Sequence, residues 1–392
     1  MAATASAAER RSVAARLSFF YIAVFLFVGV GLPFWPVWLA DRGITASGIG
    51  ILLSLSGWTK IVGNPLIAQL ADRRGDVRAV LIGAAVASLA TFALFGVTGG
   101  FWPFLLVTTV SSLGISALTP LSDSLTMRMV ATHGIDYGRV RLWGSLSFIL
   151  AGLAAGWLIA ARSPAIVLPL LLGCLALTLL AAVTLPAARG PVGTVSLAAW
   201  LQLLRDRRLL LFILAAGFIQ SSHAMLYGFG SLRWLKAGYS EDAIGVLWAI
   251  GVVAEVILFA FGGVLVRRLG PVGLLLLGGV AGMLRWVLFA LFTSLPVLVL
   301  IQLLHALTFA GTHLAAVYFL VRRAPAGLAA TAQGLYGAIA WGGLFGLAML
   351  ASGTLYAAFA AAAFHAMAAL CLVGVFCALM LIERERPRRD SR

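Results

Sequence analysis

The chain has 392 residues, of which 62% are hydrophobic and only 10% are charged, and its formal net charge is +15. So much apolar side chain cannot be hidden inside a soluble domain, so the composition predicts a membrane protein. The three cysteines lie inside apolar segments, which excludes a disulfide framework and a cysteine metal site.

Spanning helices are expected wherever about 20 predominantly apolar residues follow one another. Twelve segments meet this description: 17–39, 47–70, 78–98, 102–127, 142–161, 165–185, 209–231, 243–266, 272–293, 296–320, 327–350 and 356–382. Because the first apolar run has full spanning length, we interpret it as a helix of the protein and not as a cleaved signal peptide.

The basic residues fall mostly on one side of these spans. With both termini in the cytoplasm, the outside receives only Arg42, Arg162, Arg233 and Lys236. This distribution fixes the orientation by the positive-inside rule. The net charge is therefore a topology signal, and nucleic acid is not an expected partner.

The first two spans supply three candidate substrate contacts, Trp35, Lys60 and Asn64. Trp35 lies in a proline-containing stretch, and its ring is either part of the outer interfacial belt, where we also place Trp38, or a wall of a cavity. Lys60 shares a helical face with Asn64. A lysine at mid-membrane is costly, so it is expected to point into the bundle or a wet cavity.

Span four carries a polar stripe. Six residues recur at spacings of three or four and fall within an arc of about 80°; they are Thr108, Ser112, Ser116, Thr119, Asp123 and Thr126. Each hydroxyl could bond back to its own helix, but their alignment favours a water-lined wall. Asp123 lies near the following loop in depth, so we expect it to form a structural or gating ion pair with Arg139 or Arg141, with a proton site as the alternative.

The longest connection, residues 186–208, is rich in proline and glycine and ends in an amphipathic stretch at 198–205. It is interpreted as a cytoplasmic linker with a short interfacial helix. The chain then divides into an N-terminal half at 1–185 and a C-terminal half at 209–392.

In spans seven and ten, His223 shares a face with Tyr227, and His305 shares a face with Gln302. These four are candidate substrate contacts, although an isolated membrane histidine is more often a packing residue.

The two halves contain an internal repeat. Gly43 and Gly75 recur at Gly238 and Gly270, each shifted by 195 positions. Each copy has one charge near its middle, Lys60 in the first and a glutamate, Glu255, in the second. Parallel repeats of this kind build many transporters, with the site at the interface of the repeats. Lys60 and Glu255 are therefore expected to face each other there.

Glu255 is also the deepest intramembrane acid and the candidate proton-coupling residue. Arg285, in span nine, is either its structural partner or a contact of a substrate anion. The structural role is slightly favoured, and the choice between Lys60 and Arg285 as the partner of Glu255 stays open.

The loop Ala68-Gln-Leu-Ala-Asp72-Arg73-Arg74-Gly75 resembles the cytoplasmic loop signature of the major facilitator superfamily. Ala68 and Asp76 depart from that signature. The resemblance implies an all-α membrane fold of two pseudo-symmetric six-helix halves. It also implies that Asp72, Arg73 and Gly75 act in a cytoplasmic gate.

Further strings resemble the 3-phenylpropionic acid permease branch of that superfamily. They are Leu32-Pro-Phe-Trp35, Pro120-Leu with Asp123, Asp136-Tyr-Gly-Arg-Val-Arg-Leu-Trp-Gly-Ser145, Tyr227-Gly-Phe229, Gly251-Val-Val-Ala-Glu255, Arg285-Trp286, Gln302 with His305, and His313-Leu-Ala-Ala316. This similarity implies a proton-linked importer of an aromatic carboxylate.

We therefore predict a secondary transporter of the bacterial inner membrane, working by alternating access. It would take up a small organic solute with protons, as a monomer in the bilayer and without a cofactor. The alternatives are proton symport of a neutral sugar or nucleoside, and a receptor or assembly factor that has kept the fold. No Walker loop and no catalytic constellation occurs, so neither an ATP-driven pump nor an enzyme is expected.

Overall fold

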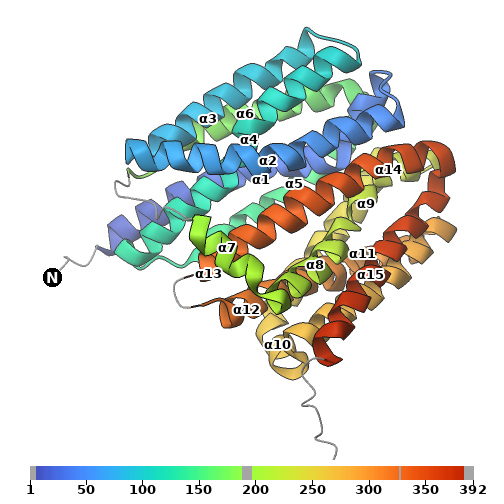
Figure 1. Ribbon diagram of the computed structural model, residues 1–392. Coiled ribbons are helices and arrows are strands. Elements are labelled where there is room, and N and C mark those ends of the chain that lie inside the picture. Colours follow the sequence, from blue (N-terminus) through green and yellow to red (C-terminus); the bar gives the residue numbers. More distant parts are fainter. Residues whose placement is uncertain (1–5, 188–196, 326–327, 384–392) are drawn as a thin grey trace, which may run out of the picture. The chain divides into compact units, whose positions relative to one another are not determined.

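The computed structural model describes residues 6–187, 197–325 and 328–383, and every element in these ranges is a helix (Figure 1). Ten helices in the described ranges are long and apolar enough to cross a membrane. Eight have 20 to 35 residues, and the other two have 51 and 52. The all-α membrane architecture is thus confirmed.

Each of the two long segments contains a break. One lies at Gly270, with φ 66° and ψ 166°, and the other at Ala360, with φ 48°. A bilayer needs only about 20 residues per helix, so each long segment has length for two crossings. The predicted number of twelve spans rests on dividing both segments at these breaks.

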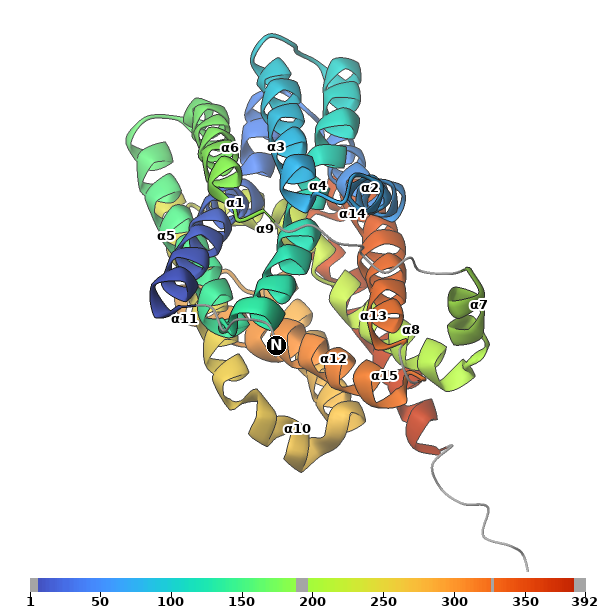
Figure 2. The same cartoon turned by 90° about the vertical axis from the view of Figure 1, so that its left-hand side faces the viewer.

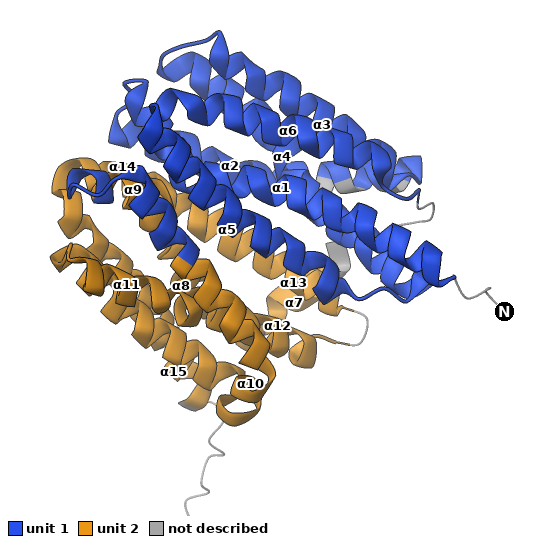
Figure 3. Cartoon of the chain, turned by 180° about the vertical axis from the view of Figure 1, so that it is seen from behind, with its two compact units in different colours: residues 1–194, 234–249 blue, residues 195–233, 250–392 orange. Residues whose placement is uncertain are grey.

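Contacts along the chain define two compact units (Figure 3). Unit 1 comprises residues 1–194 and 234–249, and unit 2 comprises residues 195–233 and 250–392. Most of the predicted linker, residues 188–196, lies outside the described ranges. The short helix expected at 198–205 is present as α7 (Leu197–Arg205).

Unit 1 is built from long helices, three of which begin at side-chain caps. They are α1 (Ala7–Asp41), α2 (Ala46–Arg74), α3 (Val77–Ala93), α4 (Phe101–His133), α5 (Tyr137–Ala161) and α6 (Val167–Thr184), with the short turns η1 (Leu94–Gly96) and η2 (Pro164–Ile166). Ser6, Asp76 and Asp136 cap α1, α3 and α5, because their oxygens accept from the first free amides. α1 packs against α5 and α6, and α4 packs against α2 and α3 (Figure 2).

Unit 2 contains more irregular helices. They are α8 (Arg207–Ser221), α9 (Ala224–Lys236), α10 (Glu241–Leu291), α11 (Leu295–Leu303), α12 (Thr312–Arg323), α13 (Ala329–Tyr336), α14 (Phe345–Phe359) and α15 (Phe364–Glu383), of which residues 234–249 belong to unit 1. Two π-helical turns, η3 (Ala306–Gly311) and η4 (Gly337–Leu344), and the 3-10 turn η5 (Ala360–Ala363) join them. Asp206 caps α8 and also accepts from Arg323 at 2.9 Å, which ties α8 to the end of α12.

The internal repeat is visible in the backbone. Gly43 and its counterpart Gly238 have φ of 77° and 89°, and Gly75 and its counterpart Gly270 have φ of 63° and 66°. Side chains are strongly disfavoured at such angles, so glycine is required at all four positions. The repeat anchors thus mark the same turns in both halves.

Gly270→Ala is expected to destabilise the protein, because φ 66° with ψ 166° belongs to a region that essentially only glycine adopts. The expected cost is about 1–3 kcal/mol, measured as a lower melting temperature of the purified protein in detergent. Gly173→Ala is the matched control, since a Cβ there meets nothing within 4 Å. Equal melting temperatures for both variants would contradict the requirement for glycine at position 270.

Candidate functional site

The span formed by α8 and α9 is interrupted at Ser222 and His223. The hydroxyl of Ser222 accepts from the indole Nε1 of Trp286 at 2.8 Å and donates to the carbonyl of Ile219 at 2.6 Å. His223 is fully buried, and its Nδ1 lies 3.0 Å from the carbonyl oxygen of Gln220. A carbonyl can only accept, so Nδ1 carries a proton and Nε2 is the acceptor of the neutral ring.

The two π-helical turns are held by the end of α8. A π turn releases backbone carbonyls from the regular helical pattern and is frequent at functional sites. Gln220 Nε2 donates to the carbonyl of Phe309 in η3 at 3.0 Å, and Ser221 Oγ donates to the carbonyl of Ala340 in η4 at 3.4 Å. Three interrupted spans therefore meet inside unit 2.

Arg285 in α10 is fully buried and holds the segment 301–308 by four hydrogen bonds. Its Nε donates to the carbonyl of Ile301 at 2.8 Å, its Nη1 to His305 Nδ1 at 3.2 Å and Thr308 Oγ1 at 3.1 Å, and its Nη2 to Gln302 Oε1 at 3.3 Å. A guanidinium has five N–H donors, so four of them are committed inside the protein. This geometry favours the structural role over direct contact with a substrate anion.

His305 lies between Arg285 and Glu255. Arginine can only donate, so His305 Nδ1 accepts and the neutral ring carries its proton on Nε2. That nitrogen lies 3.7 Å from Oε2 of Glu255, and the side chains of His305 and Glu255 are 8% and 19% exposed. The protonated edge of His305 is therefore turned toward the carboxylate, and His305 connects the buried cation to the partly buried acid.

Thr308 connects the two histidines. Its Oγ1 accepts from Arg285, lies 3.0 Å from His223 Nε2 and lies 3.3 Å from the backbone carbonyl of His305. A hydroxyl has one proton to donate. It donates to His223 Nε2 when that ring is neutral, and to the carbonyl when that ring is protonated. The direction of this hydroxyl thus depends on the charge of His223.

Gly251 leaves room for this network. A Cβ at Gly251 would lie 3.3 Å from Gln302 Nε2 and 3.5 Å from His305 Cδ2. Gly251 stands about one helical turn before Glu255. A larger residue would therefore press on the two side chains that Arg285 binds.

Six aromatic rings of unit 2 follow one another in contact and form a closed series, which we call the aromatic circuit. The successive centroid distances are 5.1 Å for His305–Phe309, 5.7 Å for Phe309–Trp341, 5.6 Å for Trp341–Phe345, 5.9 Å for Phe345–Tyr227, 5.9 Å for Tyr227–His223 and 5.3 Å for His223–His305. The histidines are buried, whereas the other four rings are partly accessible. Those four offer apolar surface to a planar aromatic group.

The structure brings together six of the residues singled out in the sequence, all of them in unit 2. They are His223, Tyr227, Glu255, Arg285, Gln302 and His305. Phe309, Trp341 and Phe345 of the aromatic circuit were missed. Their signal in the sequence is weak, because an aromatic ring in an apolar segment is equally typical of a lipid-facing position.

Lys60 and Asn64 lie on α2 in unit 1. Lys60 is exposed, and no hydrogen bond or ion pair joins it to another described residue. Asn64 accepts a hydrogen bond from Ser116 of the polar stripe at 2.9 Å. Lys60 and Glu255 belong to different units, so their predicted pairing stays a prediction.

Trp35 lies in an aromatic cluster of unit 1. Its ring stacks on Trp38 at 4.6 Å and contacts Phe92 at 5.0 Å and Phe95 at 4.9 Å. These contacts favour a packing role for Trp35. The side chain of Trp38 is also fully buried among these rings, and its expected interfacial depth stays a prediction.

Asp123 on α4 is held by tyrosines. Its Oδ1 accepts from Tyr21 at 2.5 Å and from Tyr137 at 3.2 Å. The guanidinium of Arg141 lies over the ring of Tyr21 at 5.4 Å, and Arg139 pairs with the exposed Asp136 at 3.7 Å. Two hydroxyl donors thus satisfy the carboxylate in this partly buried place. Arg141 also acts on Asp123 as a nearby positive charge, so the expected pairing with Arg141 stays a prediction.

The polar stripe of α4 is less accessible than the sequence predicts. Thr108, Ser112 and Thr126 are buried, whereas Ser116, Thr119 and Asp123 are partly accessible.

Of the loop residues assigned to the gate, Arg73 is exposed and Gly75 has φ 63°. The side chain of Asp72 lies outside the part that the structure describes.

Comparison with known proteins gives a consistent result over nearly the whole chain. The model of the MFS_1 like family matches residues 14–367. A probable 3-phenylpropionic acid transporter of Escherichia coli (strain K12) is 34% identical over 363 residues, which are 91% of this chain and 94% of that protein. The maltose permease of Geobacillus stearothermophilus is 27% identical, covering 98% of each.

Solved structures show the same fold at low identity. The crystal structure of the nucleoside transporter NupG superposes with a TM-score of 0.82 at 16% identity, covering 96% of this chain and 100% of that one. The human organic anion transporter MFSD10 gives a TM-score of 0.62 at 17% identity, covering 94% and 99%.

Proposed function

We propose that this chain, which belongs to the MFS_1 like family of the major facilitator superfamily, imports an aromatic monocarboxylate together with a proton. The chain is a multi-pass membrane transporter and not an enzyme. Its proposed substrate class follows from the relative with 34% identity, whose name is probable 3-phenylpropionic acid transporter. The proposed place is the bacterial inner membrane, with both termini cytoplasmic, and the proposed cycle is alternating access.

The aromatic circuit is the observation that carries the substrate class. The partly accessible rings of Tyr227, Phe309, Trp341 and Phe345 form an apolar surface beside a polar network. Pockets for small molecules combine such surfaces with a few placed polar groups. The phenyl ring of the substrate would lie against these four rings, and the carboxylate of the substrate would need a cation.

Lys60 is the proposed partner of that carboxylate. The other intramembrane cation of the described spans, Arg285, has four of its five donors committed. Lys60 is exposed at mid-span. An ammonium group is a compact charge that can pair with a substrate anion and release it.

Glu255 is the proposed proton carrier. Bringing a monoanion into a cell against an inside-negative potential costs about 2.3 kcal/mol per 100 mV, and one proton cancels that charge. Glu255 faces the Nε2–H of His305, which connects it to the buried cation Arg285. A substrate carboxylate bound near Glu255 would be a like charge, which favours protonation of one of the two acids. Substrate and proton would therefore enter together.

Neutral sugar or nucleoside symport is the second candidate. It is supported by the likeness to the maltose permease and to a nucleoside transporter structure. A sugar site needs several placed hydrogen-bond partners, whereas here the amide oxygen of Gln302 is already bound to Arg285. A receptor or assembly factor is the third candidate. It has no use for a buried polar network, which is costly in a membrane.

A binding panel tests the substrate class. We expect 3-phenylpropionate to quench tryptophan fluorescence of the purified protein, and its amide, maltose and uridine to have weak effects. Trp341→Leu should weaken binding about tenfold, the equivalent of about 1.4 kcal/mol for a lost aromatic contact. Trp157→Leu is the control, since that ring is 64% exposed on α5. Preference for maltose or uridine over the aromatic acid would contradict the proposal.

The gate is proposed to involve Asp72, Arg73 and Gly75 together with Asp123, Arg139 and Arg141. We expect Asp123→Ala to slow uptake severalfold while substrate affinity stays within about twofold, because it leaves the hydroxyls of Tyr21 and Tyr137 without their acceptor. Asp72→Asn should act in the same way. Tyr318→Phe, at an exposed tyrosine of α12, is the control. If either variant lost substrate binding while the protein still cycled at the wild-type rate, the proposed gate role would be refuted.

A further inference from the structure

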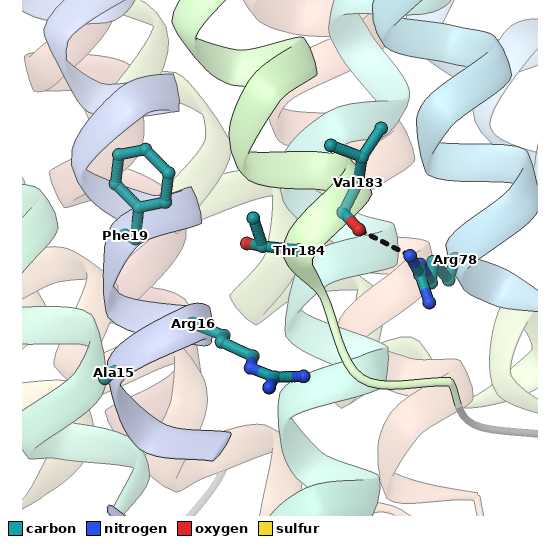
Figure 4. Close-up of a pocket in the computed structure, with 6 residues that line it drawn as sticks. All are labelled: Ala15, Arg16, Phe19, Arg78, Val183 and Thr184. Atoms are coloured by element: carbon teal, nitrogen blue, oxygen red, sulfur yellow. Dashed lines mark hydrogen bonds between the residues drawn. The ribbon is translucent and has the colours of Figure 1, made fainter. Parts of the chain in front are cut away.

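A cavity lies in unit 1, at one end of three helices. It has a volume of about 520 Å³ and is lined by Ala15, Arg16 and Phe19 of α1, Arg78 of α3, and Val183 and Thr184 at the end of α6 (Figure 4). A water molecule occupies about 30 Å³ in the liquid, so the cavity has room for a small polar head group and bound water.

The cavity holds two positive charges. Arg78 is half-buried, and its Nη2 donates to the carbonyl of Val183, whereas its Nε is buried and has no hydrogen-bond partner among the described residues. Arg16 is exposed, and no described carboxylate forms an ion pair with either arginine. Two guanidinium groups beside one cavity, with no described carboxylate paired to them, suit an anionic acceptor.

The position of the cavity indicates where that acceptor comes from. On α1, Arg16 is the last charged residue before the apolar run that starts at Leu17. On α6, Leu180 and Val183 are 56% and 42% exposed, and on α3, Val86 is 47% exposed. Val183 lines the cavity, and Leu180 and Val86 lie on the helices that form it, so their exposed apolar surface is suited to lipid tails. The two arginines lie where the apolar runs of α1 and α3 begin. Basic pockets of this kind at membrane boundaries bind lipid head groups.

We propose that this cavity binds the phosphate of an anionic phospholipid, which we call the lipid site. The phosphate would accept hydrogen bonds from the free donors of Arg16 and Arg78, and the acyl chains would follow Phe19 and the exposed face of α6. The lipid then joins α1, α3 and α6 at the same end of unit 1. This site is independent of the transported substrate.

The test is thermal unfolding of the full chain in a neutral detergent with added phosphatidylglycerol, phosphatidylcholine or inorganic phosphate. We expect phosphatidylglycerol alone to raise the melting temperature. Arg16→Gln should weaken its effect about fivefold, because an arginine near a membrane surface contributes about 1 kcal/mol to anionic lipid binding. Arg16 is the deciding position, since Arg78→Gln also removes the bond to Val183.

Arg11→Gln is the matched control, because Arg11 is exposed on the same helix and its side chain bonds only to Ala7 of its own turn among the contacts described. Equal stabilisation by phosphatidylcholine would overturn the proposal, and so would an equal effect of inorganic phosphate, which would mean a site for free phosphate. Unchanged phosphatidylglycerol binding in Arg16→Gln would overturn it as well.

Discussion

Glu255→Gln is expected to abolish accumulation of substrate driven by a pH gradient while exchange of substrate between equal pools continues. Glutamine keeps the size and the hydrogen-bonding ability of the side chain but cannot carry a proton. The contact to His305 Nε2 at 3.7 Å could therefore be kept. Binding survives, and the link between proton and substrate is lost.

The measurement compares two assays in the same proteoliposomes: uptake after an imposed inward proton gradient, and counterflow without a gradient. Glu241→Gln, at the first turn of the same helix α10, is the control and should behave as the wild type. If Glu255→Gln still accumulates substrate in response to the gradient, Glu255 is not the proton carrier.

Arg285→Met is expected to destabilise the protein by about 3 kcal/mol or more, because it removes the donor of four hydrogen bonds from a fully buried place. Arg285→Lys should recover little of this loss, since an ammonium group cannot reproduce the planar fork that reaches Ile301, Gln302 and Thr308 together. Both variants should also bind substrate poorly, because His305 loses its orientation.

Thermal unfolding in detergent, read beside substrate binding, separates the two roles of Arg285. Arg267→Gln, at an exposed arginine of α10 before the break at Gly270, is the control. A fully stable Arg285→Met variant that has lost only its affinity for the aromatic acid would show that Arg285 contacts the substrate. That result would refute the structural role.

The sequence was sufficient for the architecture because its signals are local. Apolar runs of spanning length and the glycine anchors depend on neighbouring residues, and Gly75 and Gly270 proved to share positive φ. The polar members of the site were also visible. A histidine or glutamate in an apolar segment, such as His305 or Glu255, is costly without a partner and therefore stands out.

The partners of those residues could not be predicted in the same way. Asp123 was expected to meet the arginines of the following loop, but Tyr21, which lies 102 positions earlier in the chain, supplies its hydrogen bond. Helical periodicity assumes 3.6 residues per turn, and the π turns η3 and η4 change that register. This places Phe309 and Trp341 in contact in a way that no regular helical wheel shows.

Uptake of labelled 3-phenylpropionate by wild-type proteoliposomes, beside maltose and uridine, is the most direct test of the proposed function. An inward proton gradient should drive accumulation of the aromatic acid above its external concentration, and uptake should be accompanied by alkalinisation outside. Neither neutral solute should accumulate. Accumulation of maltose or uridine in place of the acid would contradict a proton-coupled importer of aromatic carboxylates. So would uptake of the acid that stops at equal concentrations inside and outside even when the proton gradient is imposed.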